Sequence, residues 1–302
     1  MTGPRLPIDE VLADIRGSLR HNSRLVLAAP PGAGKTTRVP LALLEEDWAK
    51  QGRVLLLEPR RIAARMAAER MASSFGEKIG QTVGLSTRID RRVSQETRIE
   101  VVTDGLFARR LLNDPELPDI SAVLFDEFHE RSLNLDLGLT LAMDVQEGLR
   151  PDLRLVVMSA TLDTKGVAAK LDAPVIESAG RMFPVETIYL GKDKSFVEAQ
   201  AAAAIRRALR EQCGSILTFL PGQREIRRTV EHLSDAGADV LIAPLYGALS
   251  PKDQDLAVSP PPRGQRKVVL ATDIAESSLT IEGVTVVVDA GLSRVPEFDP
   301  GT

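Results

Sequence analysis

The sequence predicts an α/β protein of two domains, each with a mainly parallel sheet flanked by helices. Short runs rich in Val, Leu and Ile alternate with longer helical segments, which is the pattern of a doubly wound sheet. The alternation stops at residues 177–184, where Gly and Pro break it, and then restarts. A chain of 302 residues is also long enough for two domains of about 150 residues each.

Apolar runs in the first half of the chain are typical of strands that are buried on both faces of a parallel sheet. These predicted strands are residues 24–29, 53–58, 98–103, 121–126 and 154–159. Helical segments lie between the strands, and the clearest are residues 61–75 and 135–149. We therefore expect domain 1 to span residues 1–178.

The second half repeats this alternation on a smaller scale. Residues 195–212 form a predicted helix, and residues 221–237 form another that ends at Gly237, because glycine is favoured where a helix stops. The predicted strands are residues 215–220, 239–244, 266–271 and 285–290. Domain 2 is therefore expected to span residues 179–302.

Composition limits the class of protein and its partners. A net charge of −4 excludes a strongly basic coat for nucleic acid, although a local basic track remains compatible with it. Cys213 is the single cysteine, so an internal disulfide is impossible and a reducing compartment is indicated. No apolar run approaches the length of about 20 residues that spans a bilayer, and the start has no signal-peptide pattern. We expect a cytoplasmic monomer that does not enter the membrane.

Residues 29–37, APPGAGKTT, nearly match the phosphate-binding loop G-x-x-x-x-G-K-[ST] between a strand and a helix. Glycines let backbone N–H groups turn toward phosphate oxygens, and the helix N-terminus adds its dipole. Ala29 replaces the first glycine, where a small residue suffices. The alternative is a Gly-rich turn that arose by chance. The predicted nucleotide-binding residues are Gly32, Ala33, Gly34, Lys35, Thr36 and Thr37.

Two adjacent carboxylates, Asp126 and Glu127, follow the predicted strand at residues 121–126. Beside a phosphate loop, Asp126 and the Thr36 hydroxyl are predicted to hold Mg²⁺, and Lys35 to contact the β- and γ-phosphates. Glu127 is then the predicted base that orients or deprotonates the attacking water. The alternative is a strand end whose acids are simply solvated.

The segment that begins with these acids resembles a known motif. DEFH, residues 126–129, is similar to the D-E-A-H signature of superfamily 2 helicases, with Phe128 in place of Ala. The Phe, together with EPRRIAAR, is most similar to the bacterial HrpB-type branch of the DEAH-box ATP-dependent RNA helicases. Further segments resemble motifs of that family in the same order: residues 58–64, 103–107, 159–161, 217–222 and 271–281.

The resemblance implies two RecA-like domains, ATP and Mg²⁺ as cofactors, and single-stranded RNA, or else DNA, as the bound polymer. It adds His129 to the catalytic residues, and it places Arg70 and Leu292 against adenine. The implied nucleic-acid contacts are Arg60, Arg61, Thr103, Thr272 and Asp273. The implied coupling residues between the ATP site and domain closure are Ser159, Thr161, Ser277 and Thr280.

Some of these residues depart from the family pattern or have a simpler explanation. Asp273 replaces the usual asparagine, and a carboxylate beside a phosphate is repulsive, so we expect a weaker contact. Leu292 replaces a phenylalanine and offers no ring stacking, so modest discrimination among nucleoside triphosphates is expected. Arg60 and Arg61 could also form a solvated helix face, and Thr161 could cap the next helix.

Motif VI of the family, Q-x-x-G-R-x-G-R, supplies arginines to the γ-phosphate and has no match in the 302 residues. We therefore expect an N-terminal motor-core fragment with a truncated second domain and weak ATP hydrolysis. The indicated function is an ATP-dependent RNA helicase motor that moves 3′ to 5′. Two alternatives stay open: a nucleotide- and RNA-binding fragment with little turnover, and another kind of P-loop ATPase.

Overall fold

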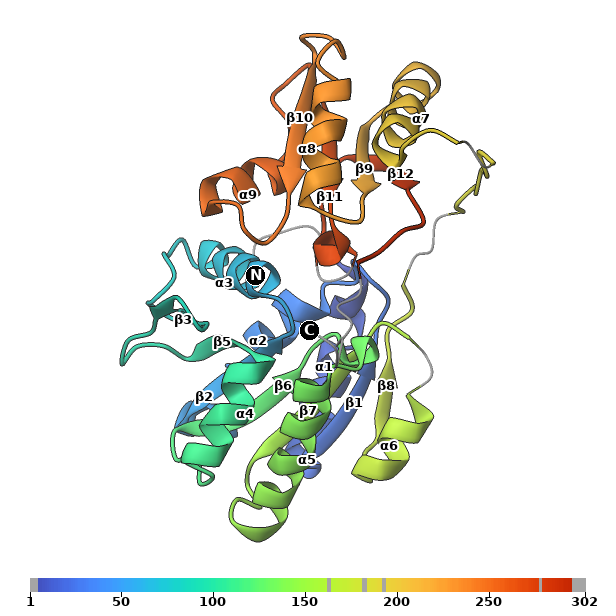
Figure 1. Ribbon diagram of the computed structural model, residues 1–302. Helices are drawn as coiled ribbons and strands as arrows, with labels where there is room; N and C mark the ends of the chain where they lie inside the picture. The colour runs from blue at the N-terminus through green and yellow to red at the C-terminus, as the bar shows by residue number, and fades with distance from the viewer. Residues whose placement is uncertain (1–4, 162–163, 181–183, 192–193, 277–278, 295–302) are drawn as a thin grey trace, which may run out of the picture. The chain divides into compact units, whose positions relative to one another are not determined.

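The computed structural model describes residues 5–161, 164–180, 184–191, 194–276 and 279–294 (Figure 1). The chain divides into two compact units, Met1–Pro184 (unit 1) and Val185–Thr302 (unit 2). Each unit has its own mainly parallel sheet flanked by helices, which confirms the predicted fold class.

Unit 1 forms, within its described residues, an eight-stranded sheet with the order β4-β3-β5-β2-β6-β7-β1-β8. Neighbouring strands are parallel, except for β3 and β4, which are antiparallel. The five predicted strands are present as β1, β2, β5, β6 and β7, with no end displaced by more than one residue. The bounds are β1 Arg24–Ala28, β2 Arg53–Glu58, β3 Val83–Ser86, β4 Arg91–Arg92, β5 Ile99–Thr103, β6 Ile120–Phe125, β7 Arg154–Ser159 and β8 Val175–Glu177.

Helices cover both faces of this sheet. Successive residues of a strand point to opposite faces, so neighbouring residues of one strand pack with different helices. Along β2, Leu56 packs with the helices α1, α2 and α3, whereas Leu55 and Leu57 pack with α4, α5 and α6. On the second face, the rings of Phe107 and Phe125 meet edge to face, with centroids 5.8 Å apart. The helix bounds are α1 Leu12–His21, α2 Lys35–Leu43, α3 Arg61–Ser74, α4 Asp104–Asn113, α5 Leu133–Gly148 and α6 Lys165–Leu171.

Unit 2 has a smaller sheet with the order β10-β11-β9-β12 and parallel pairing throughout its described strands. The predicted helix over residues 221–237 is too long, because α8 ends at His232. There Arg206 donates to the carbonyl oxygen of His232 and to Asp235, and Gly237 (φ 102°) lies in the following turn. The bounds are α7 Val197–Glu211, β9 Ser215–Phe219, α8 Gln223–His232, β10 Val240–Leu245, α9 Pro251–Val258, β11 Arg266–Ala271 and β12 Val284–Asp289.

The carboxyl ends of the parallel strands of unit 1 lie at one edge of the sheet and carry the predicted motifs. The register pairs Glu58 of β2 with Thr103 of β5, and Leu57 of β2 with Phe125 of β6. On the far side of β6, Ser159 at the end of β7 pairs with Ala28 of β1. The phosphate-loop candidate, the paired acids and the candidate nucleic-acid residues of unit 1 therefore all lie at the same edge of this sheet.

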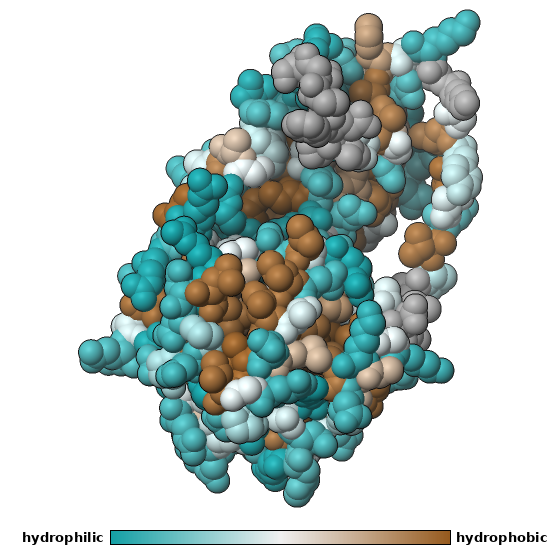
Figure 2. All heavy atoms as spheres, turned by 60° about the horizontal axis from the view of Figure 1, so that its bottom comes forward, coloured by the Kyte–Doolittle hydropathy of each residue, from teal (hydrophilic) through white to brown (hydrophobic). Residues whose placement is uncertain are grey.

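The outer surface of unit 1 includes exposed apolar side chains, and Figure 2 shows such side chains gathered on one face of it. Leu133 and Leu137 of α5 are exposed, and because they are one helical turn apart they lie on the same side of the helix. No helix among the described residues is long and apolar enough to cross a membrane.

Candidate active site

The loop between β1 and α2 has a backbone that suits a phosphate group. Gly32 and Gly34 have φ angles of 76° and 94°, in the left-handed region that favours glycine. At Gly34 a Cβ would also approach Cδ1 of Leu6 to 2.6 Å. Ala33 is buried within the loop and Thr37 lies in the first turn of α2. The loop thus ends at a helix N-terminus, where N–H groups and the dipole favour an anion.

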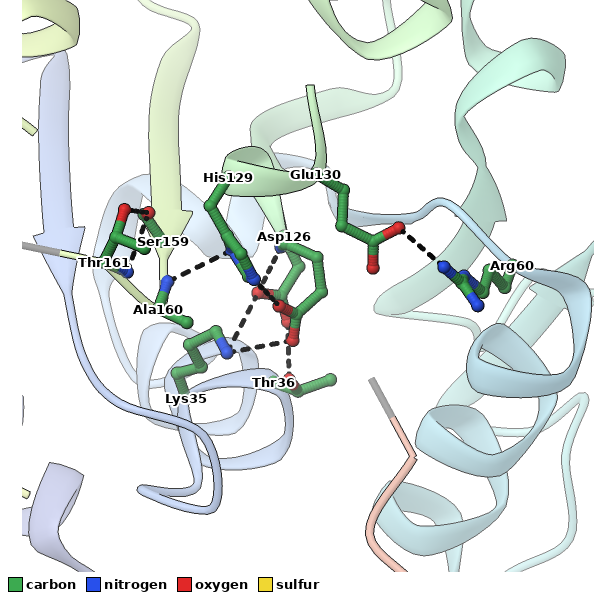
Figure 3. A network of polar contacts seen from close by, with 10 residues as sticks. Lys35, Thr36, Arg60, Asp126, His129, Glu130, Ser159, Ala160 and Thr161 are labelled. Carbon is green, nitrogen blue, oxygen red and sulfur yellow. Dashed lines mark hydrogen bonds and ion pairs between the residues drawn. The ribbon is translucent and has the colours of Figure 1, made fainter. Parts of the chain in front are cut away.

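Lys35 and Thr36, at the start of α2, face the acids that follow β6 (Figure 3). Nζ of Lys35 lies 2.9 Å from Oε1 of Glu127 and 3.9 Å from Oδ1 of Asp126. Oγ1 of Thr36 donates a hydrogen bond of 2.5 Å to Oδ2 of Asp126. The structure therefore brings these four predicted residues together from two distant parts of the sequence.

Glu58 is a further acid at this point, and sequence reasoning gave it no role. It is 1% exposed at the end of β2, and its Oε2 has no hydrogen-bond partner among the described residues. Burial, and then the charges of Asp126 and Glu127, raise the pKa of Glu58 well above its ordinary value. Burial and the charge of Asp126 also raise the pKa of Glu127.

Lys35 stays charged among these acids. Burial alone lowers the pKa of Lys35, but the charges of Asp126 and Glu127 outweigh burial, so the net effect raises the pKa. Burying an ammonium is costly unless nearby carboxylates compensate its charge. The Lys35 ammonium contacts Glu127 directly, and the pKa of Glu58 is raised further than the pKa of Glu127. Of these two acids, Glu58 therefore keeps a proton more readily.

His129 links Glu127 to the end of β7. Its Nε2 lies 3.3 Å from Oε2 of Glu127, and its Nδ1 accepts a hydrogen bond of 3.3 Å from the backbone N of Ala160. Burial, and then the charge of Lys35, lower the pKa of His129, so the ring is neutral at pH 7. Since Nδ1 is an acceptor, the proton of the neutral ring lies on Nε2 and points to Glu127.

Ser159 and Thr161 lie beside this histidine, and their hydroxyl oxygens are 3.2 Å apart (Figure 3). The alternative that Thr161 caps the next helix is wrong, because α6 begins at Lys165 and Thr164 occupies the cap position.

The three candidate nucleic-acid residues of unit 1 lie at helix starts. Arg60 is the N-cap of α3, Arg61 is its exposed first residue, and Thr103 is the N-cap of α4. Helix starts offer unpaired N–H groups to anions. Nη2 of Arg60 also donates to Oε2 of Glu130 at 3.3 Å. Arg70, the adenine candidate, is exposed on α3.

The candidates of unit 2 lie mostly at the surface. Thr272 follows β11 and precedes a short 3-10 turn that begins at Asp273, which is exposed. Thr280 is exposed, and Leu292, beyond β12, has 58% of its surface exposed. Ser277 lies outside the described residues.

The donor set at the paired acids fits Mg²⁺ held jointly with phosphate. Mg²⁺ prefers oxygen ligands and is usually held by one or two protein side chains, with waters and substrate phosphates completing its shell. Thr36, in the first turn of α2, and Asp126 place a hydroxyl and a carboxylate oxygen side by side. In the part of the chain that the structure describes, no group of three or more His, Cys, Asp or Glu could hold a metal alone.

Sequence reasoning also missed two contacts of the segment after Glu127. Glu130 accepts from Arg60, and Oγ of Ser132 donates a hydrogen bond of 2.7 Å to Oδ2 of Asp104. Glu130 and Ser132 were visible as charged and polar members of a motif, but their partners lie 70 and 28 positions away, respectively. Only the strand order brings them together.

Comparisons with known proteins agree with this geometry. Residues 10–169 match the DEAD/DEAH box helicase family, and residues 200–299 match the helicase conserved C-terminal domain. The chain is 50% identical to the ATP-dependent RNA helicase HrpB of Escherichia coli over 98% of the chain, and 32% identical to the ATP-dependent RNA helicase HrpA of Borreliella burgdorferi over 99%. It spans 37% of the length of each of these relatives.

A solved structure shows the same likeness. The crystal structure of the Escherichia coli DEAH/RHA helicase HrpB superposes on 98% of this chain and 38% of that one, with a TM-score of 0.92 and 50% identity. The predicted resemblance is therefore confirmed for the fold and the sequence together.

Proposed function

Since this chain belongs to the DEAD/DEAH box helicase family and is of the HrpB type, we propose that it is the motor of an ATP-dependent RNA helicase. It hydrolyses ATP with Mg²⁺ and uses the energy to move on single-stranded RNA in the 3′ to 5′ direction. Lys35, Thr36, Asp126 and Glu127, which converge within hydrogen-bond reach at one sheet edge, carry this proposal.

The phosphate loop holds the triphosphate through its N–H groups and the start of α2. Lys35, the buried cation beside the loop, then exchanges part of its contact with Glu127 for the β- and γ-phosphates. Thr36 and Asp126 hold Mg²⁺, which when bound neutralises charge on the phosphates.

Glu127 is the base that positions the attacking water and accepts its proton. Its raised pKa supports this role, because a base works best when its pKa approaches the working pH. His129 orients the carboxylate by donating from Nε2 and is itself held by the Ala160 amide. Ser159 and Thr161, next to that amide, couple hydrolysis to domain closure together with Ser277 and Thr280.

The polymer contacts the chain through its backbone phosphates. Arg60, Arg61 and Thr103 serve in unit 1, and Thr272 and Asp273 in unit 2, because donors at helix and strand ends suit phosphate oxygens. Arg70 and Leu292 flank adenine with little discrimination among bases. The domain division at residue 178, the monomeric state and the cytoplasmic location are also proposals, and the bound polymer is single-stranded RNA or else DNA.

A second candidate function for these 302 residues taken alone is binding of nucleotide and RNA with little turnover. The 302 residues contain no Q-x-x-G-R-x-G-R, and loss of a catalytic arginine lowers rates of related enzymes by about 10³–10⁵. Phosphate release with and without poly(A) RNA separates the candidates. RNA-stimulated release supports the motor, and binding of both ligands without release supports the second candidate. If neither ligand binds, both are refuted.

A further inference from the structure

The short turn that follows β6 is held at both of its ends. At the first end, Glu127 is in contact with Lys35 and His129. At the other end, Glu130 accepts from Arg60 at 3.3 Å. Figure 3 shows Glu130 reaching toward Arg60, away from the side on which Lys35 and His129 lie.

The turn itself is stiff. Glu127 and Arg131 have φ angles of 49° and 53°, a strained conformation that persists only where surrounding contacts enforce it. The backbone N of Glu130 donates to the carbonyl oxygen of Glu127 at 2.9 Å. The Arg131 guanidinium lies 5.3 Å from the ring centroid of the buried Phe128. A shift of Glu130 is therefore transmitted to the backbone of Glu127.

The outer end of the turn is tied to both helix starts that carry candidate nucleic-acid residues. Arg60 is the N-cap of α3, and Asp104, which accepts from Ser132, is the residue after the N-cap Thr103 of α4. Ser132 also caps α5, since its Oγ accepts from the N of Leu135 at 3.0 Å. One segment of the chain thus joins two helix starts to the candidate base.

We propose that Glu130 is a positioning residue that transmits phosphate binding at Arg60 to the candidate base Glu127. This inference rests on the proposed function above. The Glu130 and Arg60 side chains are only 17% and 23% exposed, so solvent screens their charges incompletely. A nucleic-acid phosphate bound by Arg60 lies close to the Glu130 carboxylate, and like charges at that separation repel.

This repulsion makes phosphate binding at Arg60 and the placement of the candidate base Glu127 depend on each other. Glu130 turns away when the phosphate binds, and the hydrogen-bonded turn alters the placement of the Glu127 carboxylate. By linkage, nucleotide at the phosphate loop changes the affinity of Arg60 for phosphate by the same factor. The coupling runs within unit 1, through residues 127–132.

Glu130→Gln tests this directly, because the amide keeps the size and an acceptor oxygen for Arg60 but loses the charge. We would measure the dissociation constant of a fluorescent poly(A) RNA with and without a non-hydrolysable ATP analogue and Mg²⁺. The variant is expected to bind RNA about two- to fivefold more tightly and to bring the ratio of the two constants close to one. Glu69→Gln is the matched control, since Glu69 pairs with Arg65 at 3.0 Å on α3.

A second variant tests whether both residues act through the same contact. Arg60→Gln is also expected to bring the ratio of the two dissociation constants close to one. Adding Glu130→Gln to Arg60→Gln should not change this ratio further. A wild-type ratio of one, or an unchanged ratio in Glu130→Gln, overturns the inference while leaving the proposed function intact. A wild-type chain that binds neither RNA nor the analogue overturns the proposed function, and the inference falls with it.

Discussion

Nζ of Lys35 lies 2.9 Å from Oε1 of Glu127, and both residues are almost completely buried. The pair joins the residue that is expected to bind phosphate to the residue that is expected to act as base. Breaking such a buried pair by removing one partner typically costs about 3–5 kcal/mol, because the other charge is left uncompensated. The proposed phosphate contact of Lys35 and the proposed base role of Glu127 therefore both depend on this hydrogen bond. When a triphosphate binds, its phosphates compete with Glu127 for the Lys35 ammonium.

Lys35→Ala is expected to weaken ATP binding by about ten- to hundredfold, because it removes a charged donor to the phosphates. Titration with a fluorescent ATP analogue measures the effect, and thermal melting in the absence of nucleotide reports the loss of the buried pair. Lys170→Ala is the control, since Lys170 is exposed on α6. Unchanged ATP affinity would remove Lys35 from the nucleotide site.

Glu127→Gln is expected to bind ATP with near wild-type affinity and to hydrolyse it about 10²–10⁴ times more slowly, since the amide cannot accept the proton of water. Single-turnover release of phosphate from labelled ATP is the measurement, because it detects slow chemistry. Glu96→Gln, at an exposed position, serves as the control. Wild-type release in Glu127→Gln would exclude it as the base.

The strands that position the site could be predicted from the sequence because they are buried on both faces. β2 and β7 have the predicted ends, and each has buried residues along almost its whole length. β4 and β8 could not be found in this way, because they have two and three residues and are largely exposed. Pairing with a neighbouring strand, rather than an apolar pattern, determines these short strands.

The neighbours of the site residues were harder to predict than the residues themselves. Lys35 and Asp126 stand in motifs whose chemistry is readable from spacing. Glu58 lies beside Asp126 only because β2 is inserted between β5 and β6, and neither periodicity nor motif spacing encodes that order. Glu130 was missed for the same reason, since its contact with Arg60 depends on the approach of α3 to the turn after β6.

Arg60→Ala combined with Arg61→Ala is expected to weaken the binding of single-stranded RNA to a similar extent whatever the RNA sequence. The slope of log affinity against log salt should flatten by about one unit for each lost phosphate contact. Fluorescence anisotropy over a series of salt concentrations measures both quantities. Arg207→Ala, on the surface of α7, is the control. An unchanged slope would mean that both arginines belong to a solvated helix face.

Lys267 of β11 is fully buried, and its ammonium donates to the carbonyl oxygens of Leu256 and Ser259 near the end of α9. Burial lowers the pKa of Lys267 from 10.5 to about 8. Between these values the unfolded chain holds a proton that the folded chain has lost, so stability rises with pH in this window.

Relative to Lys267→Met, the wild-type chain is therefore expected to gain up to about 3 kcal/mol of unfolding free energy between about pH 8 and pH 10.5. The cost of leaving the two carbonyl oxygens without a partner is independent of pH and does not affect this difference. Urea unfolding, monitored by the susceptibility of unit 2 to a protease, measures this difference in unfolding free energy. Lys252→Met, on the exposed side of α9, should show no such gain, and a flat difference for Lys267→Met would refute the shift.

Glu58→Gln is expected to stabilise unit 1 increasingly as pH rises. Burial beside Asp126 and Glu127 raises the pKa of Glu58 well above 4.5, so above that value the folded chain keeps a proton that the unfolded chain has released. The folded state then binds more protons than the unfolded state, and stability falls with rising pH by at most about 1.4 kcal/mol per pH unit for this group. Glutamine has no such proton, so the variant does not lose stability in this way.

Trp48, the single tryptophan, lies in unit 1 and reports the unfolding of this unit in urea. Measured with a chelator and without nucleotide, the two free energies of unfolding should be nearly equal at about pH 4.5 and should diverge toward neutral pH, whereas Glu96→Gln should follow the wild type. A variant that is less stable than the wild type at neutral pH would show that Glu58 is ionised and paired in the folded chain, and that the proton at this edge resides elsewhere.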